Sequence, residues 1–252
     1  MQIFRIFKNA LIYFERSTEI FFLNAKKIFL YMLLLSAIMA IPPTIAASNM
    51  MQTFTNNFAT VAERMPDFQL KNQEIQNDDI DPFIVNTDYV TYAYDPNNEN
   101  SQNQLNAINA NAFKIINTKD RLILDFADQS YGLNYTDDFT AQQQKDLFTS
   151  MGHFQWAYIP IAFLIVTFGQ LVLVAFIALL ATMFTALSKH SRRLKLKFSN
   201  RFRLVVVQLT VPAVVVTIIN LFTFFPYHFE IMLLYATIQT IRLMKRIKVT
   251  IL

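Results

Sequence analysis

KKIFLYMLLLSAIMAIPPTIAA, residues 26–47, is the stretch that decides the fold of this chain. Two lysines open it, and the residues that follow, 28–47, carry no charged side chain. A helix rises about 1.5 Å per residue, so this segment reaches roughly 30 Å, the thickness of the hydrocarbon core of a bilayer. We therefore predict a first transmembrane helix over residues 28–47, kinked or ended near its far end by Pro42 and Pro43.

The far end of this segment, Ile45-Ala46-Ala47-Ser48, resembles a signal-peptidase site. A cleaved signal has a short basic region and an apolar run of about 7–15 residues. Both the leading region and the apolar run are longer here, so we expect an anchor that stays uncleaved.

Residues 1–27 form the segment before this span, and within it apolar side chains recur at helical spacing over residues 2–24, with basic residues among them. That pattern is typical of an amphipathic helix in the headgroup layer, and we expect it on the cytoplasmic side. The alternative is a helix that packs on the cytoplasmic face of the protein itself.

Three further apolar runs follow, at residues 154–187, 204–225 and 227–241. As one helix, the first of these reaches about 51 Å, so it must tilt, protrude or bend. A basic loop, 188–203, and a basic tail, 242–252, separate or follow the runs. The sequence thus predicts a membrane α-helical protein with four transmembrane helices, or else one whose last two runs form a re-entrant hairpin.

The charges predict which way the chain faces. The net charge of +4 hides an acidic region, residues 48–153, in which Asp and Glu outnumber Lys and Arg, while most other basic residues flank the apolar runs. Short basic flanks stay on the cytoplasmic side. We expect a multi-pass plasma-membrane protein with both termini cytoplasmic and residues 48–153 outside the cell. The residues expected at the cytoplasmic surface, where anionic lipid headgroups would be their partners, are Lys26, Lys27, Arg192, Arg193, Lys195, Lys197, Arg242 and Arg246.

Residues 48–153 also carry the periodicities of a folded domain. We predict a helical stem that ends at Pro66, a small hairpin around Asn72-Gln73, and a mixture of short helices and strands beyond it. Such a mixture indicates a small extracytoplasmic α+β domain inserted between the first two spans. The expected strands are 90–94 and 122–126, and the expected helices are 105–115 and 139–151, the latter capped by Thr136 or Asp137.

Several kinds of chemistry are excluded by simple counts. The absence of cysteine excludes disulfides, thiolate nucleophiles and Cys-ligated metal, and three glycines are too few for a P-loop or a dinucleotide-binding turn. The three histidines form no metal-binding pair. Asp78, Asp79 and Asp81 fail the EF-hand pattern, so we interpret them as a solvated acidic loop rather than a cation site. We expect no catalytic residue, no cofactor, no metal and no nucleic-acid partner; in short, not an enzyme.

Polar residues within or beside the apolar runs are candidates for a functional site. Side-chain amides at membrane depth commonly form hydrogen bonds between helices, and a substrate path is the alternative. An ionisable pair near the start of the last span indicates either a wetted helix end or a proton or ion relay. These candidates are Gln170, Gln208, Asn220, His228 and Glu230.

The order of parts resembles a known family. The residues that carry the resemblance are Met65-Pro66-Asp67-Phe68-Gln69-Leu70-Lys71-Asn72 and Pro82-Phe83-Ile84-Val85-Asn86-Thr87, together with the lysines before the first span. They resemble an uncharacterised family of Gram-positive (Firmicutes) membrane proteins, a domain of unknown function often labelled a maltodextrin-utilisation membrane protein. The resemblance covers essentially the whole chain and implies no catalytic residues. The residues after Asn72 depart from the glycine-containing turn expected there.

The leading hypothesis is a non-enzymatic accessory or sensor component, linked to carbohydrate (maltodextrin) uptake and partnered by a membrane transporter complex or by a second copy of itself. Tyr89, Tyr92, Tyr94 and Trp156 could stack on sugar rings, although aromatic residues in strands more often belong to a core. A small transporter or channel using the intramembrane polar residues is the alternative, and a membrane-embedded enzyme is the weakest hypothesis.

Overall fold

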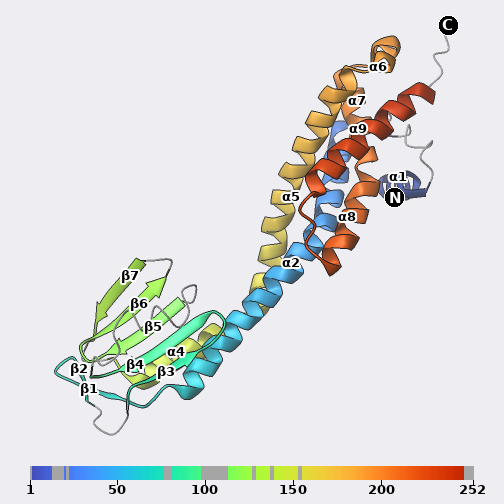
Figure 1. Cartoon of the computed structure of the whole chain (residues 1–252). Coiled ribbons are helices and arrows are strands. Elements are labelled where there is room, and N and C mark those ends of the chain that lie inside the picture. The colour runs from blue at the N-terminus through green and yellow to red at the C-terminus, as the bar shows by residue number, and fades with distance from the viewer. Residues whose placement is uncertain are drawn as a thin grey trace. The chain divides into compact units, whose positions relative to one another are not determined.

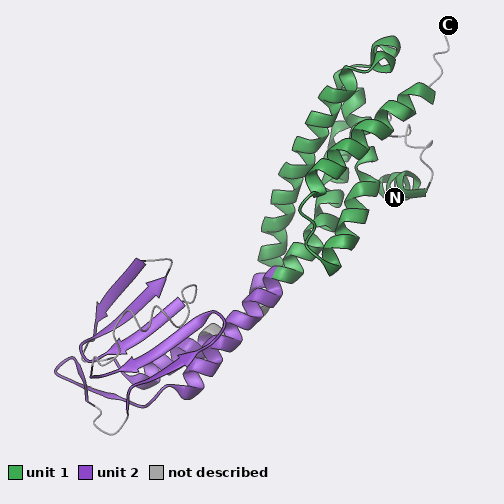
Figure 2. Cartoon of the chain, viewed as in Figure 1, with its two compact units in different colours: residues 1–46, 160–252 green, residues 47–159 purple. Residues whose placement is uncertain are grey.

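A computed structural model gives the fold of the chain, and it describes residues 2–12, 20, 23–76, 81–97, 113–126, 129–136, 139–152 and 155–246. The chain divides into two compact units (Figure 2). Unit 1 comprises Met1–Ala46 and Pro160–Leu252, and unit 2 comprises Ala47–Ile159.

The longer helices of unit 1 lie alongside one another around a shared apolar core (Figure 1). Within the described residues, three helices are long and apolar enough to cross a membrane: Ala25–Arg64, Ala157–Ala186 and Phe198–Phe222. The last predicted span, 227–241, falls in a helix that is not among these three, because polar and charged residues occupy both of its ends. The helices are α1 (Gln2–Ile12), α2 (Ala25–Arg64), α5 (Gln155–Ala186), α6 (Lys189–Leu194), α7 (Phe198–Gln208), α8 (Thr210–Phe222) and α9 (His228–Arg246). Of these, α2, α5 and α7–α9 are the ones that lie alongside one another.

Pro42 and Pro43 do not end α2, which continues through both to Arg64. Each proline removes one backbone hydrogen bond. In a bilayer the remaining backbone groups of such a helix would have no water to bind, and the continuous helix satisfies them internally. The predicted first span and the predicted stem are therefore one helix.

The third span differs from its predicted start. It begins at Phe198, inside the expected loop 188–203, and that loop also contains α6. The span is interrupted at Leu209, between α7 and α8. Pro212 lacks an N–H, so the carbonyl of Gln208 loses its usual donor four residues later, which accounts for the break at this point.

The core of unit 1 draws on α1 as well as on the long helices. α1 packs against α7 and α8, and Ile6 and Ala10 are buried in the core. One face of α1 therefore packs on the protein itself, as in the alternative given above for this segment. The opposite face exposes Phe4 and Ile12, at 68% and 59% of their surfaces. The rest of the predicted helix, residues 13–24, lies largely outside the described residues.

Unit 2 is an α+β structure. Its larger sheet has the order β3-β4-β5-β6-β7, with β4 and β5 parallel and the other neighbours antiparallel. Every residue of β4 is buried, as expected of a central strand that is covered on both faces. The strands are β1 (Gln69–Lys71), β2 (Glu74–Gln76), β3 (Phe83–Asn86), β4 (Val90–Asp95), β5 (Phe113–Thr118), β6 (Arg121–Phe126) and β7 (Gln129–Asn134).

Several local predictions for unit 2 are confirmed. β4 and β6 occupy the two predicted strands, and β1 and β2 form the predicted hairpin. Its two-residue turn places Asn72 and Gln73 at φ 57° and 63°, the left-handed region that such hairpin turns require at both positions.

Two local predictions for unit 2 are wrong. Residues 113–118 form β5 rather than the end of a helix over 105–115, and residues 105–112 lie outside the described ones. Helix α4 (Ala141–Gly152) is present as predicted, but its cap is different. Thr140 Oγ1 accepts a hydrogen bond from the Gln143 N–H, and Gln143 Oε1 accepts one from the Thr140 N–H, a reciprocal capping box.

The core of unit 2 lies between the sheet and two helices. The C-terminal part of α2 contributes Phe58, Val61 and Met65, and α4 contributes Phe148. Tyr92 and Tyr94 of β4 are fully buried in the same core. As a result α2 supplies residues to the cores of both units, since its earlier residues from Ile28 to Met39 belong to the core of unit 1.

Candidate site: a cavity in unit 1

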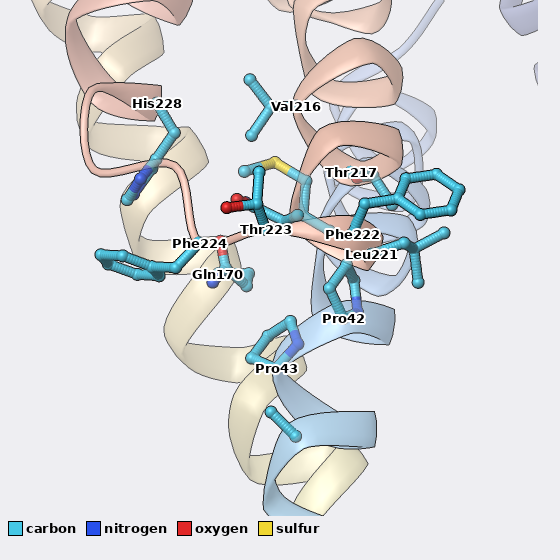
Figure 3. A pocket seen from close by; sticks show the side chains of 13 residues that line it. Pro42, Pro43, Gln170, Val216, Thr217, Leu221, Phe222, Thr223, Phe224 and His228 are labelled. Carbon is cyan, nitrogen blue, oxygen red and sulfur yellow. The ribbon is translucent and has the colours of Figure 1, made fainter.

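Three of the five polar residues singled out in the sequence line one cavity of unit 1, which encloses about 460 Å³ (Figure 3). They are Gln170 on α5, Asn220 on α8 and His228 at the start of α9. The cavity falls within the range of small-molecule sites, roughly 300–1,000 Å³. Its other lining residues are Met39, Pro42, Pro43, Ala46, Val216, Thr217, Leu221, Phe222, Thr223 and Phe224.

The lining is mainly apolar and carries little charge. None of the thirteen described lining residues is Asp, Glu, Lys or Arg, and His228 is the one titratable side chain among them. Phe222 and Phe224 remain 86% and 82% exposed. Such an environment favours an uncharged ligand with a large apolar surface.

Asn220 and His228 hold the turn between α8 and α9. Asn220 Oδ1 accepts a hydrogen bond of 2.9 Å from the Phe225 N–H. The Nδ1 atom of His228 lies 3.1 Å from the Phe225 carbonyl oxygen, to which a protonated Nδ1 donates. These contacts give both residues a structural role in the turn. In the imidazole tautomer that carries its proton on Nδ1, Nε2 of His228 is available as an acceptor.

Gln170 differs from these two residues because its Oε1 atom is buried and has no hydrogen-bond partner among the described residues. A buried acceptor left without a donor costs roughly 1–3 kcal/mol. Gln170 is therefore the lining residue with most to gain from a ligand that donates a hydrogen bond.

Gln208 and Glu230 lie apart from the cavity lining. Gln208 is 4% exposed at the end of α7, and its Nε2 atom also has no hydrogen-bond partner in the part of the chain described. Glu230 is exposed in the first turn of α9, where its charge complements the helix dipole. Because His228 lines the cavity and Glu230 does not, this arrangement does not support a proton or ion relay formed by the two residues.

The prolines of α2 were not identified from the sequence as site residues, yet both line the cavity. Because Pro42 and Pro43 lack an N–H, the carbonyls of Ile38 and Met39 have no helical donor four residues later. The signal available in the sequence was two adjacent prolines inside an apolar run, because proline within a helix leaves backbone carbonyls without their usual donors.

The basic residues predicted at the cytoplasmic surface lie at helix ends of unit 1. Lys27 Nζ donates to Gln2 Oε1 at 2.7 Å, joining α2 to α1, and a guanidinium N–H of Arg192 donates to the Leu187 carbonyl. Lys195 is the left-handed C-cap of α6. Arg242 and Arg246 line a second cavity, of about 370 Å³, with Gln239 and Lys245. The remaining three are exposed: Lys26 in the first turn of α2, Arg193 in the last turn of α6, and Lys197 at the N-cap of α7.

Arg201 is a basic residue with a structural role that the sequence did not reveal. Its guanidinium donates to Ser191 Oγ at 3.1 Å and to the Leu196 carbonyl at 3.2 Å. These bonds hold the connection between α6 and α7.

Near this connection, burial lowers the pKa of His190, and the charges of Lys245, Lys189 and Arg193 lower it further.

The aromatic residues considered for sugar stacking do not form an open platform. Tyr92 and Tyr94 are fully buried, and Tyr89 packs against the same core. The side chain of Trp156 and residues Asp78 and Asp79 lie outside what the structure describes. Within the described residues, no group of three His, Asp or Glu side chains could hold a metal ion.

Comparison with known proteins supports one part of the family resemblance, namely that the chain belongs to a family of unknown function. No curated protein and no solved structure matches the chain. A family model described as "Protein of unknown function (DUF1189)" matches residues 4–245. Since this match covers nearly the whole sequence, the chain belongs to the family of proteins of unknown function designated DUF1189.

Proposed function

We propose that the chain crosses the plasma membrane four times, with both termini in the cytoplasm and residues 48–153 outside. The support for the fourth crossing is the packing of α9, which contacts α6, α7 and α8. Its C-terminal Lys245 lies close enough to lower the pKa of His190 on α6. A helix of 19 residues spans about 28 Å, so α9 is long enough to return along α7 and α8 across the bilayer.

Single cysteines test this topology, because the chain has no cysteine of its own. The variants are Ser130→Cys in β7, Ser199→Cys in α7, Tyr227→Cys between α8 and α9, and Arg246→Cys at the end of α9. An impermeant thiol reagent on intact cells should label the first and third, and label the other two only after permeabilisation. Labelling of Arg246→Cys on intact cells would reduce the crossings to three.

We further propose a non-enzymatic accessory or sensor role in the plasma membrane of a Gram-positive bacterium. The observation that carries it is the continuity of α2, which supplies Tyr31 and Leu35 to the core of unit 1 and Phe58 and Val61 to that of unit 2. A change in unit 2 that shifts the end of α2 thereby acts on the same helix that packs in unit 1. The partner in this proposal is a transporter complex for carbohydrate, of which maltodextrin is the case that the family label suggests.

Uptake of labelled maltodextrin tests this role in a strain that lacks the gene. The wild-type gene should restore uptake. Insertion of Gly-Gly after Ser48 should not restore it, because the insertion interrupts α2 between the residues of the two cores. The same insertion after Asn97, in an exposed turn of unit 2, is the matched control and should restore uptake. Unchanged uptake on deletion of the gene would remove the carbohydrate link.

A transporter or channel is the second candidate, and the cavity that brings Gln170, Asn220 and His228 together favours it. It requires flux of a small solute into proteoliposomes that contain the purified chain alone. Asn220→Leu and His228→Leu should then reduce the flux, while Glu230→Gln, outside the cavity, should leave it unchanged. No flux across a broad panel of sugars and ions would leave the accessory role as the better account.

A further inference from the structure

We infer that the cavity of unit 1 binds an uncharged membrane amphiphile that carries a hydroxyl group, of the kind represented by a monoacylglycerol. The inference concerns the cavity alone and is independent of the accessory role proposed above. It rests on three features of the described residues: the missing charge, the unused acceptors and the apolar rim.

The missing charge selects the class of ligand. Apart from the imidazole of His228, the described lining residues carry no ionisable side chain, so the cavity has no carboxylate, ammonium or guanidinium to pair with a charged headgroup. Moving such a charge into this apolar setting without a partner carries a large desolvation cost. An uncharged headgroup enters at a much lower cost.

Oxygen acceptors without donors at the cavity indicate that the ligand carries a hydroxyl group. Gln170 Oε1 is buried without a donor among the described residues, and the carbonyl of the lining residue Met39 lacks its helical donor because residue 43 is proline. A hydroxyl group supplies the O–H that such oxygen atoms require, whereas an ester or an ether only accepts. A ligand that donates to Gln170 therefore removes an existing cost as well as making a bond.

The rim indicates that the ligand comes from the membrane. Leu221, Phe222 and Phe224 line the cavity and are also exposed, at 48%, 86% and 82% of their surfaces. Figure 3 shows Phe222 and Phe224 extending from the chain on either side of Thr223. Apolar side chains at an opening favour entry of an acyl chain, because the chain stays in apolar surroundings as it enters. A free polyol such as glycerol gains nothing from this rim.

The test uses the purified full chain in nanodiscs with a monoacylglycerol that carries a diazirine on its acyl chain. The expected cross-links fall on residues that line the cavity. Monooleoylglycerol should compete with the probe, while glycerol, oleic acid and the dimethyl ether of monooleoylglycerol should compete poorly. Effective competition by glycerol would overturn the membrane source, and equal competition by the dimethyl ether would overturn the role of the hydroxyl group.

Two glutamines give a matched pair of variants. Gln170→Leu should weaken probe binding about five-fold, as expected for one lost hydrogen bond. Gln208→Leu removes a buried amide that has an unpartnered atom but does not line the cavity, and it should leave binding unchanged. Ala46→Phe, at an exposed lining position, should reduce binding by partial filling of the cavity even if Gln170→Leu fails to fold. Wild-type binding in both Gln170→Leu and Ala46→Phe, or cross-links spread along the exposed face of α5 at Leu164 and Phe168, would show bulk lipid contact and overturn the inference.

Discussion

Asn117 on β5 and Gln144 on α4 bind each other through two reciprocal side-chain hydrogen bonds in the core of unit 2. Asn117 Nδ2 donates to Gln144 Oε1 at 2.9 Å, and Gln144 Nε2 donates to Asn117 Oδ1 at 3.1 Å. Both residues are almost fully buried, and Asn117 Nδ2 also lies 3.2 Å from the hydroxyl of Tyr92. The pair fixes the helix to the sheet in one register.

Removal of either amide should destabilise unit 2, because the remaining amide is left buried without its partner. Asn117→Ala and Gln144→Ala should each lower the free energy of unfolding by about 1–3 kcal/mol. The double variant should cost less than the sum of the two. Hydrogen exchange at the amides of β5 in the full chain measures this, and additive effects would mean that the two amides do not depend on each other.

The hairpin turn between β1 and β2 offers a stabilising substitution. Gln73 holds φ 63°, a conformation that costs a residue with a side chain about 1–2 kcal/mol and glycine almost nothing. Gln73→Gly should therefore stabilise unit 2 by roughly 1 kcal/mol. Gln73→Ala, which keeps the Cβ atom, should give no gain. Thermal unfolding of unit 2 within the full chain compares the two, and equal midpoints for both variants would contradict the strain at this turn.

A polar contact near the α7–α8 break should contribute to the stability of unit 1. Thr210 Oγ1 donates to the Val207 carbonyl, so the neighbouring hydroxyl of Tyr31 donates to Thr210 Oγ1. Tyr31→Phe should lower stability by about 0.6–2 kcal/mol, the range found for hydrogen bonds between membrane helices. A double-mutant cycle with Thr210→Val in SDS-driven unfolding isolates this contact. Absence of coupling would assign the whole effect of Tyr31→Phe to packing.

His190 should titrate below its ordinary pKa of 6.5 because of burial and of the charges of Lys245, Lys189 and Arg193. The folded chain therefore binds this proton more weakly than the unfolded chain does. The corresponding contribution to stability is fully present above pH 6.5 and is lost as the pH falls through the lowered pKa.

Lys245→Gln should move the pKa of His190 upward, and high salt should move it in the same direction by screening the cations. NMR titration of ¹³C-labelled histidine measures both effects, with His190→Gln to assign the signal. Lys71→Gln, in unit 2, is the control and should cause no change. If the pKa of His190 changes neither in Lys245→Gln nor at high salt, the packing of α9 on α6 is contradicted.

Two features of unit 2, strand β5 and the cap of α4, could not be predicted from the sequence, and each has a physical reason. Residues 113–118 alternate weakly, because β5 is buried on both faces, and their apolar periodicity fits a helix as well as a strand. Thr140 was not identified as the α4 cap because Thr136 and Asp137 are equally good capping residues by type. Only backbone geometry distinguishes such neighbours.

By itself the sequence determined that the chain has segments able to cross a membrane, because residues 28–47 and the runs 154–187 and 204–225 are long and apolar enough to span a bilayer. It also determined which polar residues lie within the apolar runs, and the α+β character of unit 2 through its local periodicities. Only the tertiary structure decided that Gln170, Asn220 and His228 share a cavity while Gln208 and Glu230 do not. The physical reason is that residues on different helices meet according to helix rotation and packing, which depend on contacts between segments distant in the chain.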